Sequence, residues 1–320
     1  MRAAILSLLL AAAPVSAETV WKHPYPSVKV LKKTLSTPSG LKIVFHAAII
    51  DLSRPEVQVI VSPPKYRGER TSRFAKAIGA QVAINGGFWE LLSKKPMGWV
   101  ISAGRPWKDL ALSDRLGFLA FTKENKAWIQ PPGSYPKPSP SDGYMVISGM
   151  PLIVDKGAPG KVRGCGYICM EHPRSAAGIS QDGWTLILAV SEGRIEGIKS
   201  TKPRAMAEFL IDLGAYQALQ LDGGGSSSLY VESLGGMLNA PAEGKERSVI
   251  NHIGVIISDP PTPSTPPPPP LHLTEDDYIP VRNVENPPRM GLLIAGGIAA
   301  VILAGVALGL VIRRRSKRPR

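Results

Sequence analysis

Hydrophobic residues occur along this chain in two contrasting patterns. Between residues 41 and 257 they form many short runs, and some alternate with polar residues, as Val57, Val59 and Val61 do. A period of two is typical of β-strands that bury one face. Near each end, in contrast, the apolar residues form one long run without charged residues, over residues 3–13 and 290–312. The pattern therefore predicts a folded domain in the middle of the chain and two apolar segments of a different kind at its ends.

The first apolar run has the organisation of a secretory signal peptide. Arg2 precedes it, and the small residues Val15-Ser16-Ala17 follow it as a cleavage site. The run is too short to span a bilayer comfortably. We expect residues 1–17 to be removed and the mature domain to lie outside the cytoplasm, in a periplasmic or extracellular space.

The second apolar run is predicted to anchor the protein in a membrane. Residues 290–312 contain no charged side chain, and residues 313–320 then carry six Lys and Arg residues. This length suits one membrane-spanning helix, and the basic tail is expected to stay in the cytoplasm. Residues 259–289 are rich in proline and predict a semi-rigid stalk. The folded domain is then expected over residues 25–258.

Within that domain the pattern predicts more strands than helices. Helices are expected over residues 70–80 and from Thr201, as N-cap, to Gly214. Strands are expected over residues 41–50, 57–61, 81–84, 98–102, 117–122, 126–129, 144–147, 184–190, 217–221 and 252–257. Many of these strands are joined by short turns. We therefore predict an α+β fold with a mixed, largely antiparallel β-sheet core and a few helices, and not a doubly wound sheet.

The charge of the chain narrows the class of expected partner. The net charge is +13, but six positive charges lie in residues 313–320 and one at Arg2, which leaves +6 for the remainder. No polybasic stripe with interleaved aromatic residues is present, so nucleic acid is not an expected partner. A mildly basic domain suits anionic cell-surface polymers or phosphorylated sugars.

The two cysteines are interpreted as a disulfide and not as a metal site. Cys165 and Cys169 are the only cysteines, and outside the cytoplasm a disulfide is favoured. A zinc site would need two further ligands, and only His172 is close in sequence. No metal and no cofactor is predicted.

Candidate chemistry is concentrated in residues 221–231, which read Leu-Asp-Gly-Gly-Gly-Ser-Ser-Ser-Leu-Tyr-Val. Three glycines allow positive φ angles and close approach of a ligand, and free amides can form an anion-binding concavity. Asp222 beside such a concavity suggests chemistry on a sugar or a phosphate. The alternative is a tight turn in which Asp222 accepts hydrogen bonds from its own backbone. The segment is neither a phosphate-binding Walker loop nor a nucleophile elbow.

Three further polar clusters follow predicted strands or precede them. They are Asn85-Gly86-Gly87-Phe88-Trp89, Pro173-Arg174-Ser175-Ala176-Ala177-Gly178, and the stretch from Asn239-Ala240-Pro241 through Arg247 to Asn251. Taken singly, each is a common turn or surface feature. Together and in this order, over about residues 40–258, they resemble the phosphodiester glycosidase family. Its best-known members are the uncovering enzymes, which remove N-acetylglucosamine from a sugar-1-phosphodiester.

The matching segments are Asn-Gly-Gly-Phe at 85–88, Arg-Ser-Ala-Ala-Gly at 174–178, Leu-Asp-Gly-Gly-Gly-Ser-Ser at 221–227, Asn-Ala-Pro at 239–241, and Arg247. One departure is Glu192-Gly193-Arg194, where the family more often has Asp-Gly-Arg. The resemblance implies a hydrolase of a sugar phosphodiester or cell-surface glycan. Its exact sugar does not transfer, because the family has members of unknown substrate.

A glycosyl phosphodiester has a leaving group that is already a stabilised anion, so cationic and N–H contacts to the phosphate matter more than strong acid catalysis. We expect Arg174 and Arg247 to contact the phosphate and Asp222 to act as base or nucleophile. Asn85 is expected to bind sugar hydroxyls or orient water. The predicted substrate-binding residues are Gly223, Gly224, Gly225, Ser226, Arg247 and Asn251. The alternative function is a non-catalytic module that binds a surface glycan or an anionic polymer.

Overall fold

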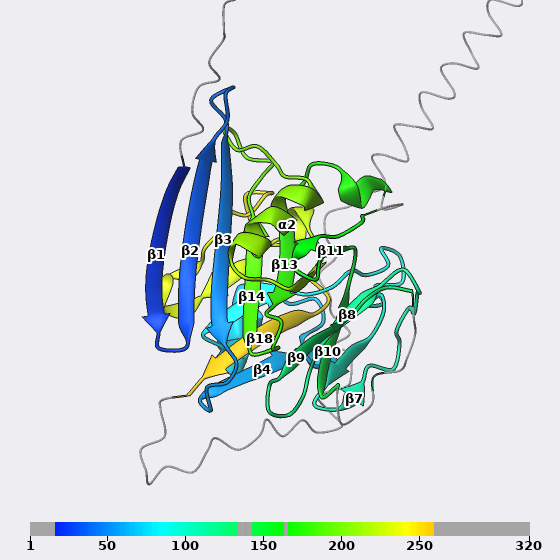
Figure 1. The fold of residues 1–320 in the computed structure, drawn as a ribbon. Coiled ribbons are helices and arrows are strands. Elements are labelled where there is room, and N and C mark those ends of the chain that lie inside the picture. Colours follow the sequence, from blue (N-terminus) through cyan, green and yellow to red (C-terminus); the bar gives the residue numbers. More distant parts are fainter. Residues whose placement is uncertain (1–16, 134–137, 139–142, 163–165, 259–320) are drawn as a thin grey trace, which may run out of the picture. The chain divides into compact units, whose positions relative to one another are not determined.

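The computed structural model describes residues 17–133, 138, 143–162 and 166–258, which build three β-sheets and two α-helices (Figure 1). Every pairing between the named strands is antiparallel. The prediction of a largely antiparallel β core with few helices is therefore confirmed. Among the described residues no helix is long and apolar enough to cross a membrane. The predicted anchor at 290–312, the stalk, the tail and residues 1–16 of the signal peptide lie outside the described residues.

The largest sheet has eight strands in the order β1-β2-β3-β14-β13-β15-β11-β12. Their bounds are β1 Ala17–Tyr25, β2 Val28–Ser36, β3 Lys42–Asp51, β11 Leu152–Asp155, β12 Ala158–Pro159, β13 Arg174–Ile179, β14 Thr185–Ser191 and β15 Gln217–Gln220. Strand β1 begins at residue 17, before residue 25, where we expected the domain to start. Its side chains are mostly exposed, so it has no buried face that would have marked it as a strand.

The other two sheets have five strands each. One has the order β7-β6-β10-β8-β9, with bounds Arg105–Pro106, Val100–Ser102, Met145–Gly149, Gly117–Phe121 and Ala127–Gln130. The other has the order β17-β16-β5-β18-β4, with bounds Gly236–Met237, Leu229–Val231, Val82–Asn85, His252–Ile257 and Val57–Val61. Helix α1, Thr71–Ile78, packs on this last sheet and buries Phe74 against it. It ends at Gly79, which has a left-handed φ of 67°.

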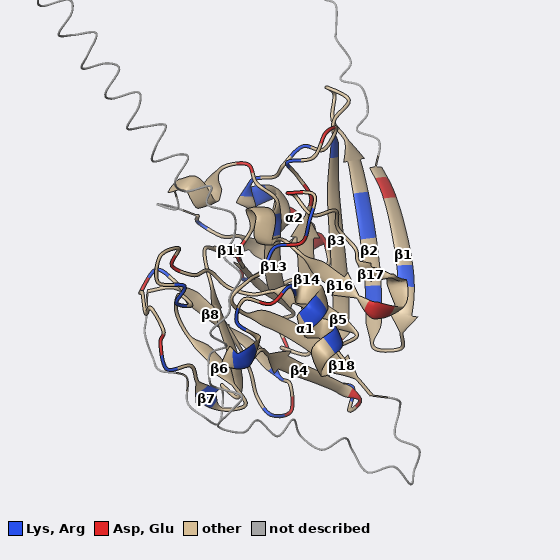
Figure 2. Ribbon diagram, turned by 180° about the vertical axis from the view of Figure 1, so that it is seen from behind, with Lys and Arg blue, Asp and Glu red and all other residues tan. Residues whose placement is uncertain are grey.

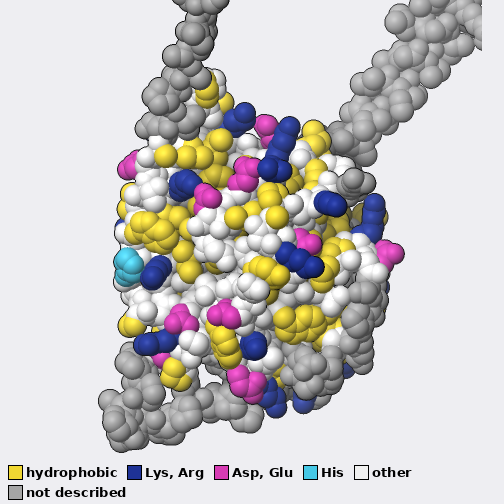
Figure 3. Space-filling view, viewed as in Figure 1, with side chains coloured by type: hydrophobic (Ala, Val, Ile, Leu, Met, Phe, Trp, Pro, Cys, Tyr) yellow, Lys and Arg dark blue, Asp and Glu magenta, His cyan; other side chains and the backbone are white. Residues whose placement is uncertain are grey.

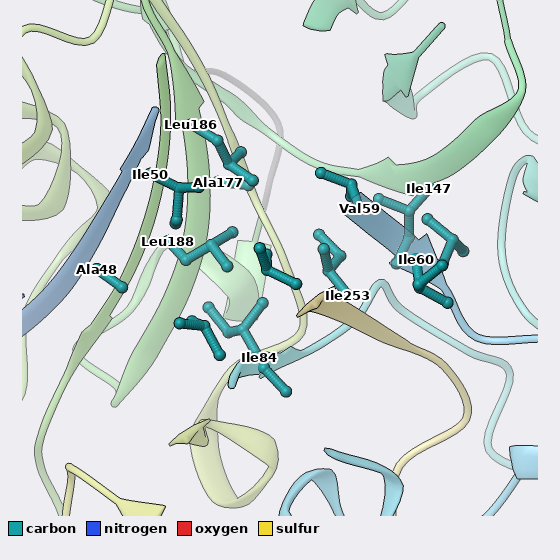
Figure 4. Close-up of a cluster of buried hydrophobic side chains, with 14 of the residues drawn as sticks. Ala48, Ile50, Val59, Ile60, Ile84, Ile147, Ala177, Leu186, Leu188 and Ile253 are labelled. Atoms are coloured by element: carbon teal, nitrogen blue, oxygen red, sulfur yellow. The ribbon is translucent and has the colours of Figure 1, made fainter. Parts of the chain in front are cut away.

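The main hydrophobic core lies between the three sheets, as Figure 4 shows. Ile50 and Leu188 come from the large sheet, Ile84 and Ile253 from the sheet of β5, and Ile147 from the sheet of β10. These five side chains are fully buried. Burying branched apolar side chains of this kind is the dominant favourable term in folding. The three sheets thus share one core, which fixes where the ends of β5, β13 and β15 meet.

A second core lies under helix α2, Pro203–Asp212, on the large sheet. Phe209 stacks on Phe45 of β3 with 4.5 Å between ring centroids. The expected cap at Thr201 is wrong by one residue, because the N-cap is Lys202 and no side chain caps the helix. The Thr201 hydroxyl is instead 2.7 Å from the Ser191 hydroxyl, which ties the helix entrance to the end of β14.

Charged residues are dispersed over the domain. In Figure 2 blue and red segments are spread over turns, strands and helix α1, and in Figure 3 the two signs are interspersed on the face shown. This distribution agrees with the absence of a polybasic stripe in the sequence. Cys169 is disulfide-bonded, while Cys165, the other cysteine of the chain, lies outside the described residues.

The short 3₁₀ turns complete the element order. They are Pro64–Tyr66, Gly166–Cys169, Gly224–Ser226 and Glu232–Leu234. Two of them, Gly166–Cys169 and Gly224–Ser226, belong to the candidate site.

Candidate active site

The Gly-rich loop leaves β15 and is joined to two other polar clusters by backbone hydrogen bonds. The Asp222 N–H donates to the Gly86 carbonyl at 3.0 Å, and the Gly224 N–H donates to the Pro173 carbonyl at 2.8 Å. The cluster after β5 and the cluster at the start of β13 therefore meet at this loop. Antiparallel pairing of β13 with β15 explains the second contact, because Ala176 lies opposite Gln220, two residues before Asp222.

Asn85 closes the end of β5 beneath the loop. Its side-chain amide donates to the Asp222 carbonyl at 2.7 Å, and its Oδ1 accepts from the Ser175 hydroxyl at 2.7 Å and the Ser228 N–H at 3.1 Å. The residue has no exposed surface. Both ends of its amide are thus used inside the protein, so Asn85 holds three segments of the site together.

The Asp222 carboxyl is partly buried and faces several donors. Its Oδ1 accepts the Gly223 N–H at 2.9 Å, and the Ser226 and Trp89 side chains also hydrogen-bond to it. Burial raises the pKa of Asp222, although these donors and the nearby charge of Arg247 act in the opposite direction. A desolvated carboxyl with a raised pKa is a frequent property of catalytic acids and bases.

Each of the three glycines of the loop is needed for a different structural reason. Gly224 has a φ of +62°, which side chains other than glycine adopt at a cost. A Cβ on Gly223 would lie 2.8 Å from the Pro173 carbonyl, and a Cβ on Gly225 would collide with Arg247 and Glu243. The amides are largely used within the loop, because Gly223, Gly224 and Ser226 all donate to protein oxygens. Three of the four N–H groups of residues 223–226, which were predicted to bind substrate, are therefore bonded to protein oxygens.

Two guanidinium groups converge on the outer side of this loop. Arg247 lies over Gly225, and its Nη1 is 3.5 Å from the Ser226 hydroxyl, while Glu243 pairs with it. Arg194 lies over Gly224, since a Cβ placed there would be 3.2 Å from its Nη1. Arg247 was predicted as a substrate-binding residue, whereas Arg194 was noted only as part of the Glu192-Gly193-Arg194 departure. No sequence pattern singles out Arg194; in the structure it is one of the few described non-glycine residues with a positive φ, 58°.

Arg194 is held in place by Tyr167, on the neighbouring 3₁₀ turn, and by His172, which follows that turn. Its Nη2 donates to the Tyr167 hydroxyl at 3.2 Å and to Nδ1 of His172 at 3.1 Å. Burial and the charges of Arg194 and Arg174 lower the pKa of His172, while its bond to the Tyr167 carbonyl opposes this. A neutral imidazole can then donate from Nε2 to that carbonyl, 3.0 Å away, and accept from Arg194. The turn thus orients the Arg194 guanidinium.

Arg174 lies on the protein side of the same loop. It is 1% exposed, and its guanidinium donates to the carbonyls of Thr201, Ile168 and Met170 and to Oε1 of Gln220 at 2.6 Å. Burial lowers the pKa of Arg174 to about 10, so the side chain stays cationic at neutral pH. Four bonds to neutral acceptors direct these donors inward. The contact of Arg174 with a phosphate stays a prediction.

Two buried polar atoms beside the loop have no hydrogen-bond partner among the residues that the structure describes. They are Nδ2 of Asn251 and the hydroxyl of Ser227. The other end of the Asn251 side chain accepts the Gly87 N–H at 2.7 Å, which fixes its orientation. Unpaired buried donors are costly unless a ligand or water satisfies them. Asn251 was a predicted substrate-binding residue, and Ser227 was quoted only as part of the motif.

Two other carboxylates, Glu192 and Glu90, have different surroundings. Although burial alone would raise the pKa of Glu192, hydrogen bonds from His46 and the Ala240 N–H lower it overall. The His46 contact measures 2.8 Å. Glu90 is exposed and accepts from the Ser93 hydroxyl. Both carboxylates hold local structure, and Asp222 is the one that lies on the Gly-rich loop.

The sequence of this chain matches the model of a known protein family. The phosphodiester glycosidase model covers residues 78–256, which is more than half of the chain. An uncharacterised protein of the SPbeta prophage in Bacillus subtilis (strain 168) is 34% identical over 95 residues. That match covers 30% of this chain and only 14% of the prophage protein.

Solved structures show where the same fold recurs. A hypothetical protein from Synechocystis superposes with a TM-score of 0.60 at 16% identity, over 77% of this chain and 64% of that one. The zebrafish N-acetylglucosamine-1-phosphodiester alpha-N-acetylglucosaminidase catalytic domain, auto-inhibited by its pro-peptide, superposes with a TM-score of 0.57 at 19% identity. That match covers 77% of this chain and 89% of the zebrafish domain. At such identities the likeness concerns the fold, and it is the family model that assigns the chain: this protein belongs to the phosphodiester glycosidase family.

Proposed function

We propose that the protein is a membrane-anchored glycosidase that hydrolyses a sugar-1-phosphodiester outside the cytoplasm. The observation that carries this proposal is the convergence of Arg194 and Arg247 on Gly224 and Gly225, beside the Asp222 carboxyl. Two guanidinium groups can bind a phosphodiester by paired charge-assisted hydrogen bonds. The family adds the substrate class, and the two apolar end segments of the sequence add the topology.

The reaction divides between the two sides of the glycosidic bond. The bond between the anomeric carbon and the phosphate oxygen breaks, and its electron pair leaves with the phosphate. Arg194 and Arg247 stabilise the charge that develops there. Water supplies the hydroxyl that joins the anomeric carbon, and its remaining proton passes to Asp222 or to the solvent. Because burial raises the pKa of Asp222, its carboxylate is a stronger base than an exposed aspartate.

The remaining site residues position these groups. Asn85 fixes the loop through the Asp222 carbonyl, and Arg174 holds the 3₁₀ turn that carries Tyr167. In this assignment both residues position the site without touching substrate. Asn251 Nδ2 and the Ser227 hydroxyl are free to bind sugar hydroxyls, which would supply the hydrogen bonds they lack.

The phosphate clamp gives the first test. Arg194→Lys and Arg247→Lys are each expected to lower kcat/KM for a sugar-1-phosphodiester by about 10- to 100-fold, because lysine lacks the planar pair of donors. Both side chains are at least partly exposed, so the thermal midpoint should change little. The measurement is release of free sugar from a panel of sugar-1-phosphodiesters by the full-length protein in detergent, alongside thermal unfolding.

A matched control comes from helix α1. Arg73 pairs with Glu69 four residues earlier, as Arg247 does with Glu243, but Arg73 lies on α1 and outside the site. Arg73→Lys should retain full activity. Unchanged kcat/KM in both Arg194→Lys and Arg247→Lys would reject the clamp.

One observation favours the non-catalytic alternative, a module that only binds a surface glycan or an anionic polymer. Asp222 accepts the N–H of the next residue, as a carboxylate that only braces a turn would. Such a module would bind the same ligands through the same arginines without releasing product.

A further inference from the structure

Exposed apolar side chains are gathered beside the candidate site. Eight large hydrophobic residues are exposed among the described residues, and the four with the greatest exposure are Leu92 at 97%, Leu91 at 68%, Tyr167 at 66% and Met170 at 57%. Leu91 and Leu92 follow Trp89, whose side chain bonds Asp222. Tyr167 bonds Arg194, which lies over Gly224. We call these four residues the apolar rim.

Leu91 and Leu92 of the rim lie on a closed turn. Trp89 and Pro96 form an isolated bridge at its base, and the Glu90 N–H donates to the Lys95 carbonyl at 2.9 Å. The Lys94 N–H donates back to the Glu90 carbonyl at 2.8 Å. These bonds fix the backbone on both sides of the two leucines, so the side chains are held in solvent by the turn itself.

Tyr167 and Met170 of the rim also lie on a backbone segment that is held in place. Arg174 binds the carbonyls of Ile168 and Met170 from the protein side, and Cys169 between them is disulfide-bonded. The Tyr167 ring packs on His172 with 4.4 Å between centroids. Tyr167 and Met170 are therefore exposed on a braced segment, as the leucines are. Apolar side chains that a braced backbone holds in water beside one site are typical of a surface that meets an apolar partner.

We propose that the apolar rim enters the surface of a lipid bilayer and that the substrate is presented there, with a lipid as the non-sugar arm of the phosphodiester. The substrate part of this inference rests on the proposed function. Lys94 and Lys95 beside the leucines, and Arg194 beside Tyr167, complement anionic lipid headgroups. Leucine next to lysine is also the composition of side chains that insert at the lipid–water interface.

The chain beyond the described residues makes this contact reachable. The 31 residues 259–289 precede the apolar run at 290–312. Extended polyproline geometry rises about 3.1 Å per residue, so the predicted stalk can span roughly 100 Å.

The test uses the full-length protein reconstituted in vesicles of phosphatidylcholine and phosphatidylserine. Leu92→Cys is labelled with an environment-sensitive nitrobenzoxadiazole dye under non-reducing conditions, which leaves the native disulfide intact. Ser39→Cys, on the exposed turn between β2 and β3, carries the same label as the control. We expect nitroxide-labelled lipids to quench the dye at position 92 and not at position 39.

A second measurement addresses the substrate. Leu91→Ser/Leu92→Ser should slow hydrolysis of a lipid-linked sugar phosphodiester in vesicles by roughly tenfold or more, because removal of two leucines weakens insertion. Hydrolysis of a soluble sugar-1-phosphodiester should stay unchanged. Equal quenching at positions 92 and 39 overturns the membrane contact. A blue-shifted dye at position 92 that lipid nitroxides fail to quench also overturns it, because a protein would then cover the rim. Quenching confined to position 92 in a protein that hydrolyses nothing supports the contact and rejects the proposed function instead.

Discussion

Replacing Asp222 with Asn is expected to abolish turnover while the fold and the binding of substrate persist. Asparagine keeps the size of the side chain and the Oδ1 acceptor for the Gly223 N–H, but it can neither take up a proton nor attack the anomeric carbon. Loss of a general base or acid costs about 10²- to 10⁴-fold in rate. The measurement pairs product release with equilibrium binding of the same sugar phosphodiester, for the wild type and the variant.

Asp182 offers a matched control. Its carboxylate accepts the Ser180 hydroxyl and the Trp184 N–H on the turn between β13 and β14, the same kinds of donor that Asp222 accepts. Asp182→Asn should therefore keep its activity. Near wild-type turnover in Asp222→Asn would make Asp222 a brace of the loop, and binding without turnover in the wild type itself would favour the non-catalytic module.

The stability of the wild type and that of Asp222→Asn should also respond differently to pH. Because burial raises the pKa of Asp222, the folded protein retains a proton that the unfolded chain releases at lower pH. Ionisation of Asp222 thus lowers stability as pH rises from the usual aspartate range through the raised folded value. Asp222→Asn lacks this penalty. The thermal midpoint of the variant, measured relative to that of the wild type, should therefore increase from acidic to neutral pH.

Arg174→Lys is expected to act on stability more than on chemistry. Lysine carries its three donors on one atom and cannot reach the carbonyls of Thr201, Ile168 and Met170 together with Gln220. If two of these bonds are lost, the free energy of unfolding should fall by about 3 kcal/mol or more, since hydrogen bonds to buried charged groups are among the strongest. Thermal or denaturant unfolding of the full-length protein measures this loss.

The comparison with Arg247→Lys makes the result decisive. Arg247 is partly exposed and should show the reverse pattern, with a lower kcat/KM and an unchanged midpoint. An Arg174→Lys protein that unfolds normally but has lost kcat/KM would instead place Arg174 in contact with substrate, as the sequence first suggested.

The fold could be predicted where the side chains alternate clearly. Strands with β-branched residues on one face, such as Val57–Val61 and His252–Ile257, are where the sequence placed them. Strand β13 was not recognised, because Arg174–Ile179 consists mostly of small residues without a period of two. It nevertheless lies between β14 and β15 at the centre of the large sheet, where Gly178 lets Ala215 and Ala218 approach closely. Tertiary packing, and not local preference, makes it a strand.

The candidate site could be predicted as a set of segments but not as a set of roles. The resemblance of the polar clusters to one family brought together Asn85, Asp222 and Arg247, and the structure places them around one loop. It could not distinguish Arg174 from Arg194, because burial decides which guanidinium faces inward. Only the tertiary structure shows that Arg174 is 1% exposed while Arg194 lies over Gly224. The same holds for Trp89, because no pattern in the sequence pairs its side chain with Asp222.

Hydrolysis in ¹⁸O-labelled water tests the central claim most directly, because it identifies the bond that breaks. The full-length protein is incubated with a sugar-1-phosphodiester, and the two products are separated and examined by mass spectrometry. Attack at the anomeric carbon, with Arg194 and Arg247 holding the departing phosphate, places the label in the reducing sugar and leaves the phosphate unlabelled. Label in the phosphate would mean that water attacks phosphorus, and it would contradict the assignment of Asp222 to the anomeric centre.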